Sequence, residues 1–140
     1  MAKILVVEDD GDIRDLIRMV LEMGGHELHE AKTGEEGLAQ ARALRPDVIL
    51  MDLSLAGTID GLESTRRLRA DASFDRTPII ALTAHAMLGD RERSLVAGCD
   101  QHWTKPITNL ERFKRMIERV VAEGRTGSNS AASSLNPEPV

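Results

Sequence analysis

Residues 47–55 read DVILMDLSL, and this stretch decides the fold class expected of the chain. Its four consecutive apolar residues, 48–51, lack the polar alternation of a half-buried strand, so they predict a strand that is buried on both faces. Strands of this kind occur in parallel sheets that carry helices on both sides. The run stops at Asp52, which places a carboxylate at the carboxyl end of the predicted strand.

The rest of the chain alternates short apolar runs with longer segments of helical spacing. Apolar runs predict four further strands, over residues 4–7, 27–31, 79–82 and 101–104. Apolar positions three and four residues apart, together with caps, Gly and Pro, predict five helices, over residues 12–23, 34–44, 61–72, 86–97 and 108–123. Five strand–helix units in strict alternation predict an α/β fold, a doubly wound parallel sheet with helices on both faces.

Composition excludes several classes of protein. The 140 residues suffice for one compact domain, expected over residues 1–124, and a short extension. Residues 125–140 are rich in Ser, Asn and Pro, which predicts a disordered tail with no output domain after it. A net charge of -5 and only three aromatic residues argue against direct nucleic-acid binding, which needs clustered cations or stacking rings. No apolar run approaches the roughly 20 residues that span a bilayer, so we expect a cytoplasmic protein without membrane contact.

Several single residues have simple structural interpretations. Cys99 is the one cysteine, which excludes an internal disulfide and a cysteine-rich metal site, and we expect it to fill a small buried space. His26 and His29 lack the spacing of metal ligands and are expected at the surface. Arg69, on the polar side of the helix predicted at 61–72, is expected to face water.

Polar residues stand at the carboxyl ends of four predicted strands. They are Glu8, Asp9 and Asp10 after the first strand, Asp52 after the third, Thr83 after the fourth and Lys105 after the fifth. Ligands of parallel α/β sheets bind at this edge. Converging carboxylates raise each other's pKa unless a cation lies among them, and Mg²⁺ is a hard cation that prefers oxygen ligands. A metal ion, a carboxylate, a hydroxyl and a fixed ammonium group are the parts that a phosphoryl-transfer site needs.

Each of these residues, taken singly, has a simpler structural interpretation. Acidic residues before a helix are commonly caps that the helix dipole favours. A single Asp after a strand often forms a turn, Thr83 is a candidate cap for the next helix, and a Lys-Pro pair ends a strand. All four features nevertheless occur at the ends of different strands and in the required order, and this constellation favours the phosphoryl-transfer hypothesis.

Four segments carry a resemblance to a known family. The stretches ILVVEDD, DVILMDLSL, PIIALTAHA and TKPI resemble the four signature segments of the response-regulator receiver domain of two-component signalling, with the similarity covering about residues 3–123. The resemblance implies a flavodoxin-like five-stranded parallel sheet of strand order 2-1-3-4-5. It also implies a stand-alone receiver, since the TAHAM run is similar to stand-alone and hybrid-kinase receivers.

The resemblance further implies a set of metal ligands and a phosphoacceptor. By position in the motifs, Asp52 would accept the phosphoryl group and would also bind Mg²⁺. Asp9 would bind the ion directly, whereas Glu8 would act mainly through a water molecule of the metal. The main-chain carbonyl of Ser54 would complete the protein ligands. Asp10 falls outside the acidic pair of the family.

Phosphoryl recognition and signalling are implied for three more residues. Thr83 would hydrogen-bond one phosphoryl oxygen and Lys105 would pair with another, and Thr83 would also act as a switch residue. His102 stands where the family usually has a Tyr or Phe switch side chain, and its imidazole can become charged near neutral pH. Trp103 is expected inside, under the last helix, because successive strand residues point to opposite faces.

The resemblance implies partners rather than a free substrate. The phosphoryl donor would be a histidine kinase or a histidine phosphotransfer protein, and the output would be a downstream protein contact or onward phosphotransfer. The surface of the helix at 86–97, the strand at 101–104 and the helix at 108–123 would change on phosphorylation, and by analogy it would also serve a homodimer. The chain would assist its own phosphorylation and dephosphorylation without being a turnover enzyme.

Two alternative functions differ in class from this hypothesis. A Mg²⁺-dependent phosphatase with an aspartyl nucleophile would share Asp52, the hydroxyl and the lysine. Such enzymes usually carry a second Asp two residues after the nucleophile, where this chain has Ser54, and they need a cap over the substrate that 140 residues do not provide. A receiver-like module that works without phosphate is the other alternative, although all the acceptor-site residue types are present.

Overall fold

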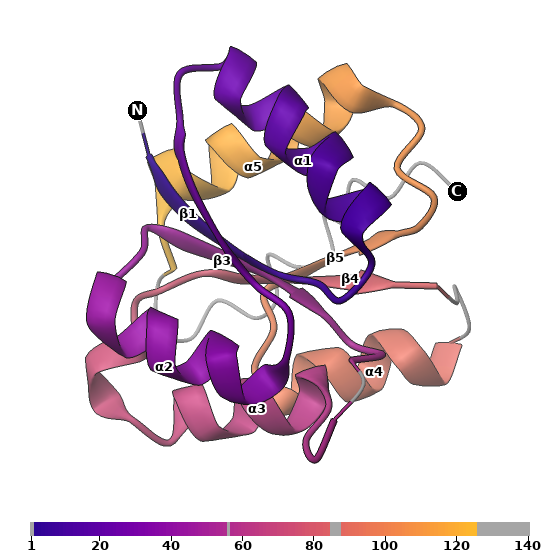
Figure 1. Ribbon diagram of the computed structural model, residues 1–140. Helices are drawn as coiled ribbons and strands as arrows, with labels where there is room; N and C mark the ends of the chain where they lie inside the picture. Colours follow the sequence, from indigo (N-terminus) through magenta and orange to yellow (C-terminus); the bar gives the residue numbers. More distant parts are fainter. Residues whose placement is uncertain (1, 56, 85–87, 126–140) are drawn as a thin grey trace.

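The computed structural model describes residues 2–55, 57–84 and 88–125 (Figure 1). Its elements are β1 (Lys3–Val7), α1 (Gly11–Met23), β2 (Glu27–Ala31), α2 (Gly34–Leu44), β3 (Val48–Asp52), α3 (Gly61–Arg69), the 3₁₀ helix η1 (Ala72–Phe74), β4 (Ile79–Thr83), α4 (Leu88–Ala97), β5 (Gln101–Thr104) and α5 (Leu110–Glu123). All neighbouring strands are parallel, in the order β2-β1-β3-β4-β5, which confirms the predicted sheet. Within the described ranges, no helix combines the length and the apolar character needed to cross a membrane.

The sheet is covered on both faces, as the unbroken apolar run of β3 predicts. Helices α1 and α5 lie on one face, and α2, α3 and α4 lie on the other (Figure 1). Successive residues of a strand serve different cores, because side chains alternate across the sheet. Val6 and Leu50 belong to the core under α1 and α5, whereas Leu5 and Met51 belong to the core under α2 and α3.

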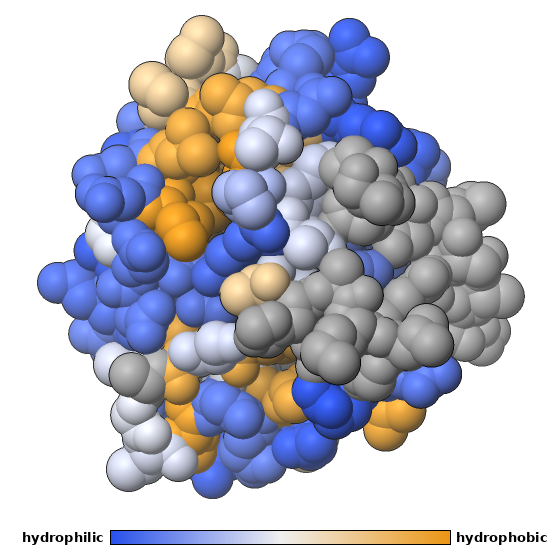
Figure 2. Space-filling model, turned by 90° about the vertical axis from the view of Figure 1, so that its right-hand side faces the viewer, coloured by the Kyte–Doolittle hydropathy of each residue, from blue (hydrophilic) through white to orange (hydrophobic). Residues whose placement is uncertain are grey.

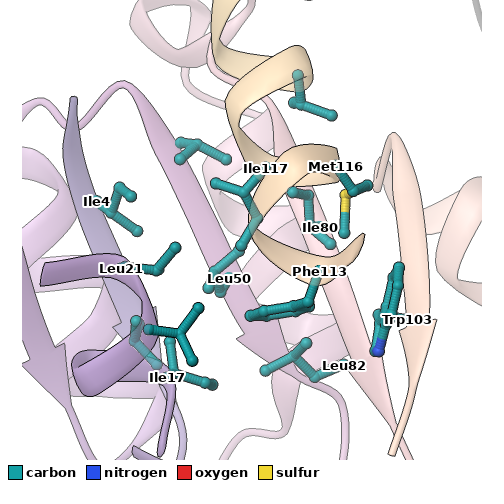
Figure 3. Close-up of a cluster of buried hydrophobic side chains, with 14 of the residues drawn as sticks. Ile4, Ile17, Leu21, Leu50, Ile80, Leu82, Trp103, Phe113, Met116 and Ile117 are labelled. Carbon is teal, nitrogen blue, oxygen red and sulfur yellow. The ribbon is translucent and has the colours of Figure 1, made fainter. Parts of the chain in front are cut away.

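The core under α5 contains most of the aromatic surface of the chain. Trp103 on β5 and Phe113 on α5 meet edge to face, with ring centroids 5.4 Å apart and an interplanar angle of 70° (Figure 3). Both side chains are fully buried, which confirms that Trp103 lies inside under the last helix. This packing fixes the end of β5 that leads to Lys105 against the last helix of the chain.

Hydrogen bonds to capping side chains explain where several helices begin and end. The Asp60 carboxylate accepts a hydrogen bond from the Glu63 main-chain nitrogen, and α3 starts directly after Asp60. This helix ends at Arg69 rather than at residue 72, because the Asp71 carboxylate caps the separate 3₁₀ helix η1. The last helix starts at Leu110, two residues later than predicted. The predicted start of α4 at residue 86 lies outside the described residues.

His26 is not the surface residue that its sequence context predicts. Its side chain is only 9% exposed, and Nδ1 accepts a hydrogen bond from the main-chain nitrogen of Ala2 at 3.1 Å. Its other ring nitrogen, Nε2, lies 2.9 Å from the Glu118 carboxylate on α5. His26 therefore links the residue before β1 to the last helix, and its contact with Glu118 joins residues 92 positions apart.

Arg69 is the second side chain whose predicted exposure is wrong. Its guanidinium donates to the main-chain oxygens of Gly98 and Phe74, at 2.9 and 2.7 Å, and to the Asp100 carboxylate at 2.9 Å. It thereby joins the end of α3 to the turn before β5. Cys99, next to this turn, is buried as predicted, and burial raises the pKa of its thiol to about 12.

Arg125 is the last described residue and the first of the predicted tail. Its guanidinium donates to the Asp100 carboxylate at 2.6 Å and to the main-chain oxygen of Asp75 at 2.9 Å. The packed part of the chain thus extends through this residue. Residues 126–140 lie outside the described residues.

Candidate functional site at the carboxyl edge of the sheet

The strand order places the topological switch point of the sheet at the carboxyl ends of β1 and β3. These two strands are neighbours in the sheet, but the chain leaves β1 toward α1 on one face and leaves β3 toward α3 on the other (Figure 1). The carboxylates of Glu8, Asp9 and Asp52 meet there, with one oxygen of each lying within 4.8 Å of the others. Glu8 and Asp52 are buried, and Asp9 is exposed.

Lys105 places its ammonium group within ion-pair distance of two carboxylates of this cluster. Its Nζ lies 2.9 Å from a Glu8 oxygen and 3.3 Å from Asp52 Oδ1. The main-chain nitrogen of Lys105 donates to the Thr83 oxygen at 2.7 Å, which fixes the end of β5 to the end of β4. Burial alone would lower the pKa of Lys105, but its pairing with Glu8 and Asp52 outweighs burial and raises it. Lys105 is therefore a fixed positive charge in the site.

Glu8 carries the most perturbed carboxylate of the site. Burial and the neighbouring Asp52 carboxylate raise the pKa of Glu8 from its ordinary 4.5 to about 7, although Lys105 and the Asp10 main-chain nitrogen oppose the shift. Two of the three carboxylates, Glu8 and Asp52, are buried side by side, and this proximity favours the protonated form of one of them. Glu8 is therefore more easily protonated than an ordinary glutamate.

Asp52 is held in one orientation by its own turn. The main-chain nitrogen of Ser54 donates to Asp52 Oδ1 at 3.0 Å, and the nitrogen of Leu53 donates to the Leu82 oxygen of β4 at 3.0 Å. Both bonds hold the Asp52 carboxylate in place at the end of β3. The role of the Ser54 carbonyl as a metal ligand stays a prediction.

Asp10 has the structural role that its position outside the acidic pair suggests. Its carboxylate accepts hydrogen bonds from the main-chain nitrogens of Asp12 and Ile13, at 2.9 and 3.3 Å, and so caps α1. Its own main-chain nitrogen donates to a Glu8 oxygen at 3.1 Å. The cap thereby also orients Glu8.

Thr83 and His102 lie on the same face of neighbouring strands. Thr83 is the last residue of β4, and His102 is paired with Ala81 in the β4–β5 register, so both side chains point toward the α3–α4 side of the sheet. Both residues are buried. Trp103 points to the opposite face, as expected.

Two residues near the cluster escaped prediction. A Cβ atom on Gly61 would lie 2.0 Å from the main-chain oxygen of Asp52, so α3 starts in direct contact with the end of β3. Arg14 on α1 donates from Nη1 to the main-chain oxygen of Glu8 at 2.9 Å. No local pattern marks either residue, because both contacts depend on how helices dock beside the strand ends.

The surface beside the cluster is hollow and partly apolar. Figure 2 looks onto the carboxyl edge of the sheet and shows a hydrophobic patch bordered by hydrophilic residues in its upper part. A cavity of about 460 Å³ opens there, lined by Asp12, Ile13, Leu16, Ala84, Lys105, Pro106 and Ile107. Lys105 thus borders both the carboxylates and this cavity.

The donor set fits a hard divalent cation. Carboxylate oxygens are ligands that Mg²⁺ prefers, and the ion keeps several waters, for which the exposed Asp9 side leaves room. The pKa of Glu8 is raised first by burial and then by the neighbouring Asp52 carboxylate, and a bound cation would counter both effects by stabilising the ionised form. An acidic pocket compatible with Mg²⁺ is therefore present.

These features define a class of protein. The sequence profile of the response regulator receiver domain matches residues 4–118, and the chain belongs to this family of two-component signalling proteins. Among individual proteins, it is similar to the polar-differentiation response regulator DivK of Brucella anthropi. The two are 38% identical over 120 residues, which cover 86% of this chain and 96% of DivK.

Solved structures support the same assignment. The chemotaxis response regulator CheY4 of Vibrio cholerae superposes with a TM-score of 0.79 at 31% identity, covering 86% of this chain and 98% of CheY4. The receiver domain of the sensor histidine kinase PA1611 from Pseudomonas aeruginosa PAO1 has the same TM-score and coverage at 36% identity. That structure carries a magnesium ion coordinated in its active-site cleft.

Proposed function

We propose that the chain accepts a phosphoryl group on Asp52 from a histidine kinase or a histidine phosphotransfer protein, with the cytoplasm as its expected location. The observation that carries the proposal is the arrangement around this carboxylate. Asp52 is buried at a strand end, Lys105 lies 3.3 Å away, and Glu8 and Asp9 complete an acidic cluster. A nucleophilic carboxylate, a fixed cation and oxygen ligands are what phosphoryl transfer from phosphohistidine requires.

The proposed reaction forms one bond and breaks one. An Asp52 carboxylate oxygen attacks phosphorus, the bond from phosphorus to the donor's imidazole nitrogen breaks, and that nitrogen keeps the electron pair and regains a proton. Lys105 pairs with one phosphoryl oxygen, and the Thr83 hydroxyl donates to another. Mg²⁺, held by Asp9, Asp52, the Ser54 carbonyl and, through water, Glu8, would neutralise charge on the phosphoryl oxygens.

The proposal predicts that only the protein with Asp52 intact is phosphorylated. Incubation with acetyl phosphate and Mg²⁺ should add the mass of one phosphoryl group to the wild-type chain and none to Asp52→Asn, because an amide is a far weaker nucleophile than a carboxylate. Intact-mass spectrometry measures the gain. Asp10→Asn is the matched control, since asparagine keeps both the cap of α1 and the main-chain bond to Glu8, and it should be phosphorylated like the wild type.

Two results would contradict the proposal. Equal mass gain in Asp52→Asn would place the acceptor elsewhere, and no gain in any variant would favour a module that works without phosphate. Sustained turnover of free phosphomonoesters at ordinary enzyme rates would instead favour the phosphatase alternative.

The output is proposed to pass through Thr83 and His102. A phosphoryl group on Asp52 draws the Thr83 hydroxyl toward it, and His102, on the same face of the adjacent strand, moves into the space that Thr83 leaves. The surface formed by α4, β5 and α5 then differs between the two states. A downstream protein, the next protein of a phosphorelay or a second copy of the chain would bind the phosphorylated form of this surface.

This switch predicts a pH dependence that tyrosine would remove. His102 is already only 7% exposed, and a further move inward would cost a protonated imidazole its remaining hydration. Saturation with beryllofluoride should therefore convert a smaller fraction of the wild type at about pH 6 than at about pH 8. His102→Tyr should convert equally at both pH values, and His102→Ala should convert incompletely at both. NMR chemical shifts of the main-chain amides in β5 and α5 measure the fraction of protein that has been converted. Identical conversion in all three proteins would show that His102 is not the switch residue.

A further inference from the structure

The side chain of Arg14 links the acidic loop to the edge strand of the sheet. Arg14 lies on α1, and its side chain is only 14% exposed. Its Nη1 donates to the main-chain oxygen of Glu8 at 2.9 Å, and its Nε lies 3.4 Å from a Glu30 carboxylate oxygen on β2. The other Glu30 oxygen pairs with Arg18, one helical turn further along α1. One guanidinium thus connects three elements: α1, β2 and the loop after β1.

The oxygen that Arg14 binds belongs to the peptide unit between the two acidic residues. The Glu8 main-chain nitrogen donates to the Ala31 oxygen of β2 at 3.0 Å, so Glu8 is held on both sides of its Cα atom. The peptide plane between Glu8 and Asp9 sets the direction in which the two side chains leave the chain. A bond to its carbonyl therefore constrains both carboxylates at once.

We propose that Arg14, oriented by Glu30, is a positioning residue that holds the Glu8–Asp9 peptide in the orientation the divalent-cation site needs. The proposal rests on the proposed function, because it takes this cluster as the metal site. Arg14 acts through the main chain and contributes no ligand. Supporting groups of this kind commonly change metal affinity by one or two powers of ten when they are removed.

Charge and geometry predict opposite effects of removing Arg14, which makes the proposal testable. Deleting a positive charge beside a cation site strengthens cation binding by Coulomb's law. Releasing the peptide carbonyl instead lets the two carboxylates diverge and weakens binding. We expect geometry to dominate, so Arg14→Gln should raise the dissociation constant for Mg²⁺ about tenfold. Titration calorimetry with MgCl₂ measures it.

Arg18→Gln is the matched control. Arg18 has the same charge, lies on the same helix and shares Glu30, but its described partners are Glu22 and Glu30 rather than the acidic loop. It should bind Mg²⁺ as tightly as the wild type, or slightly more tightly. Arg14→Lys should fall between wild type and Arg14→Gln, since a single ammonium group can reach the carbonyl but cannot also keep the second contact, the 3.4 Å ion pair with Glu30.

A second readout needs no metal and separates the two proposals. In ¹⁵N relaxation without Mg²⁺, the Asp9 and Asp10 amides should become more mobile in Arg14→Gln and stay as in the wild type in Arg18→Gln. Unchanged amide dynamics, or Mg²⁺ affinity equal to or above that of the wild type in a folded Arg14→Gln protein, would overturn the positioning role. If the wild type itself binds no Mg²⁺, the metal part of the proposed function fails, and the relaxation data alone decide whether Arg14 holds the peptide.

Discussion

Gly61→Ala is expected to lower the free energy of unfolding by about 3 kcal/mol or more, the upper range for overpacking a close-packed site. The added Cβ would lie 2.0 Å from the Asp52 main-chain oxygen and 2.8 Å from its carbonyl carbon. These are backbone atoms at the end of a buried central strand, so only a shift of α3 or of the β3 end relieves the clash. Urea denaturation followed by circular dichroism measures the change.

Gly11→Ala is the matched control for this substitution. Gly11 and Gly61 are each the first residue of a helix and each follows a capping Asp. A Cβ on Gly11 meets only the Arg14 side chain, at 3.5 Å, so alanine there should be neutral or stabilise by up to about 0.5 kcal/mol. Because the strained atoms in Gly61→Ala belong to Asp52, phosphorylation by acetyl phosphate should also slow in that variant. Equal stability of the two alanine variants would contradict the close approach of α3 to β3.

Glu8→Gln is expected to stabilise the metal-free protein by about 2 kcal/mol at about pH 8, less than the roughly 1.4 kcal/mol per pKa unit would give for the whole shift, because nearby water screens part of it. The pKa of Glu8 is about 7 in the folded protein and ordinarily 4.5. The folded state therefore keeps a proton that the unfolded chain releases between these values. The stability that this proton contributes is full below about pH 4.5 and is lost as the pH rises through about 7. Glutamine is neutral at every pH, so Glu8→Gln does not lose this stability as the pH rises.

Magnesium should reverse the order of the two proteins. With EDTA, urea denaturation at about pH 5 and about pH 8 should show a decline across this range in the wild type that Glu8→Gln lacks. Saturating Mg²⁺ at about pH 8 should stabilise the wild type strongly and the variant weakly, since the variant lacks one carboxylate of the cluster. Glu63→Gln, a change on the outer face of α3, should keep the wild-type pH dependence. A wild type with the same pH dependence as Glu8→Gln would show that Glu8 is ionised in the metal-free site.

The fold was largely predictable because its evidence is local. The apolar run at 48–51 and its counterparts identify strands without knowledge of any partner, and the spacing of apolar residues identifies the helices. The errors lie at element ends and on polar faces. α3 stops early because Asp71 caps a new turn, and Arg69 turns inward because the turn at Gly98 offers it a carbonyl. Neither partner is visible from the spacing of apolar residues in α3.

The sequence predicts which residues form the candidate site, but it does not predict their burial or ionisation. Strand ends of a parallel sheet meet at one edge, so the sequence by itself determined that Glu8, Asp52 and Lys105 would lie together. Only the tertiary structure decided that Glu8 is buried deeply enough for its pKa to reach about 7, while Asp9 stays exposed.

Supporting contacts were likewise decided by the tertiary structure alone. Gly61 touches the Asp52 carbonyl, Arg14 binds the Glu8 carbonyl, and His26 joins Ala2 to Glu118. Strand and helix preferences follow from neighbours along the chain. Burial, ionisation and close approach instead depend on distances of a few ångströms between elements, and these distances are set only when the helices pack on the sheet.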